Sequence, residues 1–151
     1  MKKKLLVSLL TMIMGFSVLD ISASAKSKAG ECYSSVTSAV GALDCNATTD
    51  ATYYYSGATS IDVTTWFDDN VPKKWWPEGS RVKLVRNGKV IYTSSRGVMA
   101  PGSTGFVGYR SIPIKSKWGN GTYYVYAEFY DNDSGKWFAR TKSKAKIYLA
   151  R

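Results

Sequence analysis

The sequence predicts an all-β protein, an antiparallel β-sandwich of about seven strands. Three observations predict this class. Short segments alternate between apolar and polar residues, turn residues separate these segments at regular intervals, and no segment after residue 51 has a helical period. Tyr and Trp are plentiful, and both suit half-buried pleated surfaces.

The first 25 residues have the three parts of an export signal peptide. Lysines at positions 2–4 begin it, residues 5–18 form an apolar stretch, and Ala-Ser-Ala at 23–25 precedes a cleavage point. A retained membrane anchor is the alternative, but the apolar run is shorter than the roughly 20 residues of a bilayer span. We therefore expect a secreted protein. Cleavage removes three lysines and one aspartate, so the net charge falls from +10 to about +8.

Cys32 and Cys45 are the only cysteines in the chain. An even pair in an exported protein predicts a disulfide, which stabilises a fold with so short a loop by about 3 kcal/mol. A redox or metal pair is the alternative, but there is no C-x-x-C spacing and no His. We expect residues 26–51 to form an N-terminal arm pinned by this disulfide, with a possible short helix at 34–43. Residues 52–151 form the sandwich.

Strand patterns begin at residues 52–55 and 60–66. In the second segment Ile61, Val63 and Thr65 share one face, as in a half-buried strand.

The clearest element is a hairpin at residues 81–93. Asn87 and Gly88 supply the positive φ angles of a type I′ turn, and β-branched runs flank them.

Three further strands are expected at 106–114, 121–130 and 137–149. Pro113 places the first at an edge or at a bulge. Alternation at Tyr123, Val125, Ala127 and Phe129 predicts a central strand. The last strand carries Lys142, Lys144 and Lys146 on one face, which is typical of a protected edge strand.

The residue inventory argues against catalysis. Without His there is no Ser-His-Asp triad and no common zinc site. Asp68 and Asp69 are adjacent in a loop, while Glu78 and Glu128 stand alone, so no carboxylate pair faces a sugar. We predict no enzyme activity and no cofactor.

Residues 131–135 (Asp-Asn-Asp-Ser-Gly) resemble the opening of a calcium loop, but the bidentate Glu that completes such a loop is missing. Because Asp, Asn and Gly also favour turns, we predict a hairpin turn and no metal.

The segment 68–79 is the candidate contact loop, because two prolines bracket Lys73, Lys74, Trp75 and Trp76. Adjacent residues of an extended segment point in opposite directions, so one indole could be exposed beside a lysine for binding. The alternative is that both indoles fill the end of the sandwich.

Positive charge is clustered at 81–89, 115–117 and 136–146. Such a surface attracts anionic cell-wall polymer or anionic lipid, or it only solubilises the protein. No nucleic-acid-binding signature is present, so we expect no nucleic-acid partner. The leading hypothesis is a monomeric, non-enzymatic basic binding domain associated with the anionic cell envelope. A membrane-active antimicrobial or toxin-like protein, or a binder or inhibitor of another secreted protein, are the alternatives.

Two segments also carry a family resemblance, at 79–93 and 121–129. The second resembles the G-T-Y-x-V-x-A strand of immunoglobulin-like domains in bacterial surface and secreted proteins. Together with the leader, the chain is similar to small secreted bacillus proteins grouped as a family of unknown function. The resemblance implies an immunoglobulin-like sandwich over roughly the last 90 residues. It transfers no catalytic or binding residue.

Overall fold

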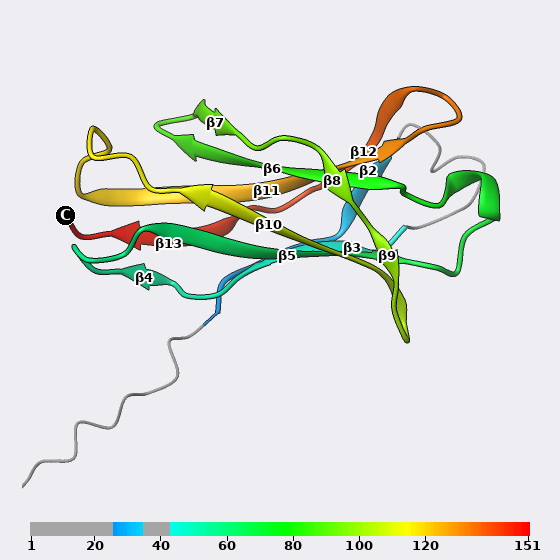
Figure 1. Cartoon of the computed structure of the whole chain (residues 1–151), viewed down its shortest axis with the longest axis horizontal. Coiled ribbons are helices and arrows are strands. Elements are labelled where there is room, and N and C mark those ends of the chain that lie inside the picture. The colour runs from blue at the N-terminus through cyan, green and yellow to red at the C-terminus, as the bar shows by residue number, and fades with distance from the viewer. Residues whose placement is uncertain (1–25, 35–42) are drawn as a thin grey trace, which may run out of the picture.

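The computed structural model describes residues 26–34 and 43–151, and in these residues the predicted all-β sandwich is confirmed (Figure 1). The described residues form two sheets, antiparallel except where β4 (Tyr53–Tyr54) pairs with β13 (Ala145–Leu149), and one single-turn 3₁₀ helix. The predicted signal peptide, 1–25, and most of the possible helix at 34–43 lie outside the described residues. No helix in the described part of the chain has the length and apolar character to span a membrane.

The first sheet has five strands. In spatial order they are β1 (Lys28–Gly30), β3 (Cys45–Thr49), β5 (Ser60–Asp68), β10 (Gly105–Pro113) and β9 (Ala100–Pro101). β5 pairs along its length with β10, and Pro113 lies at the last residue of β10, opposite Ser60. Because β9 covers β10 only at Phe106 and Val107, Pro113 lies where no ladder hydrogen bond is needed.

The second sheet is built around β11 (Gly121–Asp131). One edge of β11 pairs with β6 (Gly79–Arg86), and the other pairs first with β13 (Ala145–Leu149) and then with β12 (Lys136–Thr141). The outer positions are filled by β2 (Cys32–Ser34), β4 (Tyr53–Tyr54), β7 (Lys89–Thr93) and β8 (Gly97–Val98).

Two predicted elements are confirmed in detail. β6 and β7 form the expected hairpin, and its turn residues have positive φ angles, 50° at Asn87 and 75° at Gly88. β11 is the expected central strand, since Tyr123, Val125 and Phe129 are fully buried between the sheets. Local turn chemistry and a clean period of two determine both elements.

Two expectations are corrected. The segment 137–149 is not one edge strand: it breaks at 142–144 into β12 and β13, which β2 and β4 cover on their outer sides. The described part of the predicted arm, 26–51, contributes β1, β2 and β3 to the two sheets. Its small side chains alternate between buried and half-buried in β3, so this polar-looking segment packs between β1 and β5.

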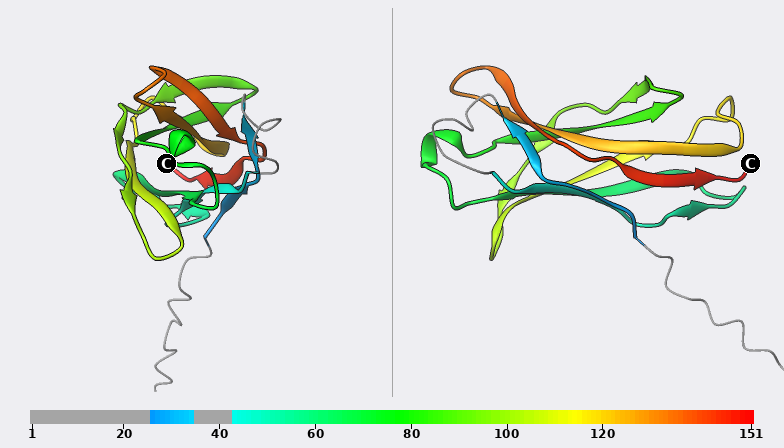
Figure 2. Two further views of the ribbon diagram at one scale, coloured as in Figure 1. Left: turned by 90° about the vertical axis from the view of Figure 1, so that its right-hand side faces the viewer. Right: turned by 180° about the vertical axis from the view of Figure 1, so that it is seen from behind.

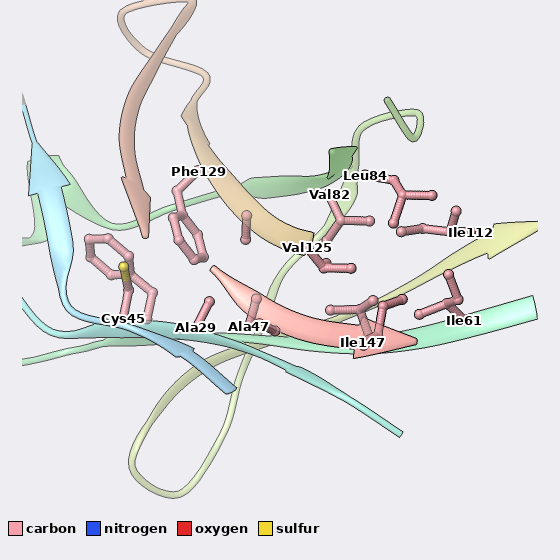
Figure 3. Close-up of a cluster of buried hydrophobic side chains, with 14 of the residues drawn as sticks. Ala29, Cys45, Ala47, Ile61, Val82, Leu84, Ile112, Val125, Phe129 and Ile147 are labelled. Carbon is pink, nitrogen blue, oxygen red and sulfur yellow. The ribbon is translucent and has the colours of Figure 1, made fainter. Parts of the chain in front are cut away.

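The core lies between the two sheets, where their inward side chains meet (Figure 3). Phe67 of the first sheet packs against Phe129 and Phe138 of the second, with ring centres 5.1 and 5.5 Å apart. At the other end of the core, Ile61 and Ile112 face the second sheet (Figure 3). Burial of these apolar side chains supplies the main driving force for folding.

One long edge of the sandwich is closed by the chain itself, which crosses from the first sheet to the second between β1 and β2. Glu31 makes the crossing in the left-handed region, at φ 55°. Its carbonyl accepts a hydrogen bond from Lys142 N at 2.8 Å, so the break at 142–144 holds the crossing in place. Immediately beyond it, the disulfide joins Cys32 of β2 to Cys45 of β3, with Cα atoms 5.5 Å apart. The predicted disulfide is therefore present and links the two sheets.

The opposite edge is closed by Arg110 of β10. Its Nε donates to Ser80 O at 2.7 Å and its Nη2 donates to Val98 O at 3.0 Å, so one guanidinium ties the first sheet to β6 and β8. A Cβ at Gly97 would lie 2.4 Å from this guanidinium, so the position has no room for a side chain. Burial lowers the pKa of Arg110 from its ordinary value.

Loss of the inter-sheet disulfide should destabilise the fold. We expect the double variant Cys32→Ala and Cys45→Ala to lose about 3 kcal/mol of unfolding free energy, because the unfolded chain regains the entropy of an open loop. Denaturant unfolding with and without reductant measures this. Reductant should lower the wild-type midpoint to that of the variant and leave the variant unchanged. A variant as stable as the oxidised wild type contradicts the prediction.

A second prediction concerns alkaline pH. The buried Tyr54 hydroxyl donates to Asp50 Oδ1 at 2.6 Å, and burial, reinforced by this carboxylate, raises the Tyr54 pKa. Below about pH 10 the tyrosine is neutral in both states and its contribution is fully present. Above that pH only the unfolded state ionises, so stability falls. Tyr54→Phe should cost about 1 kcal/mol at neutral pH and flatten the alkaline decline measured by thermal unfolding. An equally steep decline in the variant contradicts this assignment.

Candidate functional site

The outward side of the second sheet carries a row of charged and aromatic residues. The strand registers place Arg81 of β6 opposite Glu128 of β11, Glu128 opposite Arg140 of β12, and Arg140 opposite Tyr33 of β2. We call this surface the cationic face and define it by six residues: Tyr33, Arg81, Lys83, Trp137, Arg140 and Lys142. Four strands from distant parts of the chain therefore build one row.

Aromatic rings hold the cations of this face. The Arg81 guanidinium carbon lies 3.8 Å from the centre of the Trp137 ring. Arg140 and Lys142 lie 5.4 and 5.5 Å from the ring centre of Tyr33, which is 56 % exposed. Cation–π attraction restricts the side chains without neutralising them. The positive charge of Arg140 and Lys142 is thus held in place beside an exposed ring.

One carboxylate, that of Glu128, lies within the row. It accepts from Arg81 Nε at 2.5 Å and from Lys83 Nζ at 3.0 Å, and all three side chains are largely buried. Lys142 additionally contacts Glu31 at 3.5 Å, but Glu31 is mostly exposed and this pair is weak. The four cations of the cationic face outnumber the two carboxylates that they contact, Glu128 and Glu31, so its net charge is positive.

A shallow hollow of about 260 Å³ opens on this face, between Tyr33, Glu128, Trp137 and Arg140. Most of its lining comes from β12, and it includes one guanidinium, that of Arg140, and the rings of Tyr33 and Trp137. Guanidinium groups bind phosphate oxygens with two parallel hydrogen bonds. The hollow can therefore hold one anionic group of a larger ligand.

The candidate contact loop lies at the end of the sandwich, between β5 and β6 (Figure 2). It is not extended: Lys73–Trp75 form the 3₁₀ helix η1. Lys73 and Lys74 are exposed, as a contact loop requires, but Trp75 and Trp76 are both half-buried and pack against the core. Of the two arrangements that the sequence left open, the structure has the one in which both indoles pack at the end of the sandwich, because a helical turn does not alternate its side chains between two sides.

The two indoles have structural contacts. The Trp76 ring packs at a tilt against Phe106 with ring centres 5.0 Å apart, and its Nε1 donates to Val71 O at 3.0 Å. The Trp75 Nε1 is buried without a hydrogen-bond partner in the described residues. Lys73 and Lys74 lie 6.0 and 5.3 Å from the ring centres of Trp76 and Trp75. The structure brings the four predicted residues together, with only the lysines directed to solvent.

An open groove of about 610 Å³ runs beside this loop. Lys73, Lys74 and Trp76 line one part of it, and Asp131 and Asp133 line another. The Asp131 carboxylate accepts from the main-chain N–H groups of Asp133 and Ser134, which forms the predicted turn. Because acids and lysines share the groove, it is less suited to an anion than the cationic face.

The described residues contain no group of three or more His, Cys, Asp or Glu side chains that could hold a metal ion. The pKa shifts of Tyr54, Tyr123 and Arg110 all have burial as their first cause. Each of these groups is hydrogen-bonded within the fold. The shifts therefore reflect packing.

Sequence reasoning found part of the cationic face. The clusters at 81–89 and 136–146 contain its cations, but Tyr33 and Trp137 were not assigned to a site. A signal was present in the alternation of Arg81 and Lys83 along a predicted strand, which places both on one side. The pairing of β2 with β12, which adds Tyr33, has no local signal.

Comparison of this chain with known protein families, with curated proteins and with solved structures finds no match. The resemblance to secreted bacillus proteins and the immunoglobulin-like type of sandwich therefore stay predictions. Function must be argued from the surface itself.

Substitution can separate packing from binding in the contact loop. Trp76→Ala should lower the unfolding free energy by about 2 kcal/mol, because the Phe106 contact and the Val71 hydrogen bond are both lost. The matched double variant Lys73→Gln and Lys74→Gln, at neighbouring exposed positions, should stay within about 0.5 kcal/mol of wild type. Denaturant unfolding measures both. A stable Trp76→Ala protein would show that the indole is not a packing residue.

Proposed function

We propose that the protein is a secreted, non-enzymatic basic binding domain that associates with the anionic cell envelope through the cationic face. The observation that carries this proposal is the row of cations on one side of the second sheet: Arg81 and Lys83 pair with Glu128, and Arg140 and Lys142 lie beside the exposed Tyr33 ring. Charge that served only solubility would not need to be aligned in one row across four neighbouring strands.

The chemistry of the cationic face suits a phosphate-bearing polymer such as a wall teichoic acid. Arg140 is exposed and lies beside the hollow, where its planar guanidinium can bind two phosphate oxygens at once. Tyr33 restricts Arg140 and Lys142, which lowers the conformational entropy lost when a ligand binds. Repeated phosphates along a polymer can contact several cations, and each contact releases a counterion.

Two further features support the location and the class. The Cys32–Cys45 disulfide is typical of proteins outside the reducing cytoplasm, and the predicted signal peptide gives a route there. A domain that binds its ligand through fixed charges needs no side chain with the shifted pKa that is typical of a catalytic group. Lys73 and Lys74 at the end of the sandwich can extend the contact with a long polymer.

Capture by cell walls tests the proposal. The oxidised protein without residues 1–25 is mixed with native walls, with walls stripped of teichoic acid, and with anionic liposomes, at low and high salt. We expect capture by native walls alone, weakening steeply as salt rises. The double variant Arg140→Gln and Lys142→Gln should bind about tenfold more weakly and reduce the slope of log affinity against log salt by about 1 per charge.

The matched control is Lys115→Gln with Lys117→Gln, which removes the same charge from exposed positions in the loop between β10 and β11. This control should bind nearly as wild type. Equal weakening of both double variants would mean that net charge alone attracts the wall. Capture by liposomes but not by walls would transfer the proposal to the membrane, and no capture at all would overturn it.

A further inference from the structure

The outward side of the first sheet has a different chemistry from the cationic face. The registers of β3, β5 and β10 align Thr48, Thr64 and Tyr109 in one row, and place Asp62 beside Ser111 in the next. An open groove of about 620 Å³ runs along these residues. We call it the hydroxyl groove and define it by six lining residues: Thr48, Asp50, Asp62, Thr64, Tyr109 and Ser111.

Tyr109 supplies an aromatic platform at this groove. Its side chain is 74 % exposed, although it is a large ring at the middle of a nine-residue strand. Its neighbour Arg110 turns toward the second sheet, so the pleat directs Tyr109 outward. The C–H bonds on the flat side of a pyranose ring carry partial positive charge and pack on the negative face of an aromatic ring.

The polar groups of the groove are already oriented. Asp62 Oδ1 accepts from Ser111 Oγ at 2.7 Å, and Asp50 Oδ1 accepts from Asp62 N at 2.9 Å and from Tyr54 OH at 2.6 Å. These bonds fix both carboxylates through one oxygen, and the second oxygen of each has no hydrogen bond in the described residues. Carboxylate oxygens held in this way accept hydrogen bonds from paired sugar hydroxyls at little entropic cost.

The side-chain charges that line the groove are balanced, two positive and two negative. Lys26 and Arg110 accompany Asp50 and Asp62, and the remaining lining side chains are hydroxyls, Tyr109 and Val63. A balanced groove gives no net attraction to a polyanion, in contrast to the cationic face. Its volume lies in the range of small-ligand sites, and its open shape admits a chain that continues at both ends.

We infer that the hydroxyl groove is a binding site for a neutral saccharide chain, with Tyr109 as the stacking platform and Asp50, Asp62 and Ser111 as hydrogen-bonding groups. This site is independent of the proposed function, because it lies on the other sheet and uses none of the cations of the cationic face. The protein then carries two binding surfaces of different chemistry on its two opposite sides.

Titration calorimetry with neutral hexasaccharides of glucose, of N-acetylglucosamine and of mannose tests the site. We expect at least one of them to bind with a dissociation constant of about 1 mM or below. Affinity should not change between low and high salt, because the ligand has no charge. Tyr109→Ala should weaken binding about tenfold, whereas Tyr109→Phe, which keeps the ring, should retain most of it.

Tyr55→Ala is the matched control, since Tyr55 is 72 % exposed and lies next to β4, away from the groove lining. It should bind as wild type. Asp62→Asn, which preserves the shape of the side chain, should weaken binding through loss of the charged acceptor. Circular dichroism of each variant verifies the fold, and the exposed positions of all three residues favour folded variants.

Three results would overturn the inference. The first is the absence of binding by every hexasaccharide at about 10 mM. The second is equal loss of affinity in Tyr109→Ala and Tyr55→Ala. The third is a protein dimer, seen by light scattering, that Tyr109→Ala dissociates, because the groove would then be an interface between two copies. These results do not bear on wall capture by the cationic face, so the two proposals can fail separately.

Discussion

The crossing of the chain at Glu31 is the constraint on which the rest of the sandwich depends. It places β1 in one sheet and β2 in the other, and the disulfide just beyond it holds the two sheets together. The break between β12 and β13 follows from it, since Lys142 must turn to hydrogen-bond the crossing. On the far edge Arg110 performs the equivalent task with a guanidinium. A covalent bond and a half-buried cation thus close the two long sides of one core.

The two outer surfaces differ because each strand of a sandwich alternates its side chains between the core and the solvent. The inward positions are constrained by packing, as at Ile61, Val125 and Phe129. The outward positions have no such packing constraint, and in this protein the two sheets carry two different sets of outward side chains. Arginine, lysine and aromatic rings face outward from the second sheet, while threonine, serine and a tyrosine face outward from the first. One fold therefore offers two unlike surfaces without a second domain.

Much of the fold could be predicted from the sequence because its signals are local. Asn87 and Gly88 determine their hairpin, and the alternation from Tyr123 to Phe129 determines the central strand. The role of 26–51 could not be predicted, because its strands are short and their small residues lack an apolar period. The cationic face could be predicted only in part. Its cations are visible as sequence clusters, but their register with Tyr33 depends on pairing between the two ends of the chain.

That pairing has a consequence for the order in which the fold can form. β2 lies near the start of the described chain, and its partner β12 lies more than a hundred residues later. β1 pairs with β3, which is close to it in the sequence, but the residues at the crossing also bond to the distant Ser143. β2 therefore has no strand to pair with until β12 is present, and forming this pair closes a long loop of chain. Such a topology makes the finished sandwich depend on contacts between residues far apart in the chain, and folds of this kind form slowly.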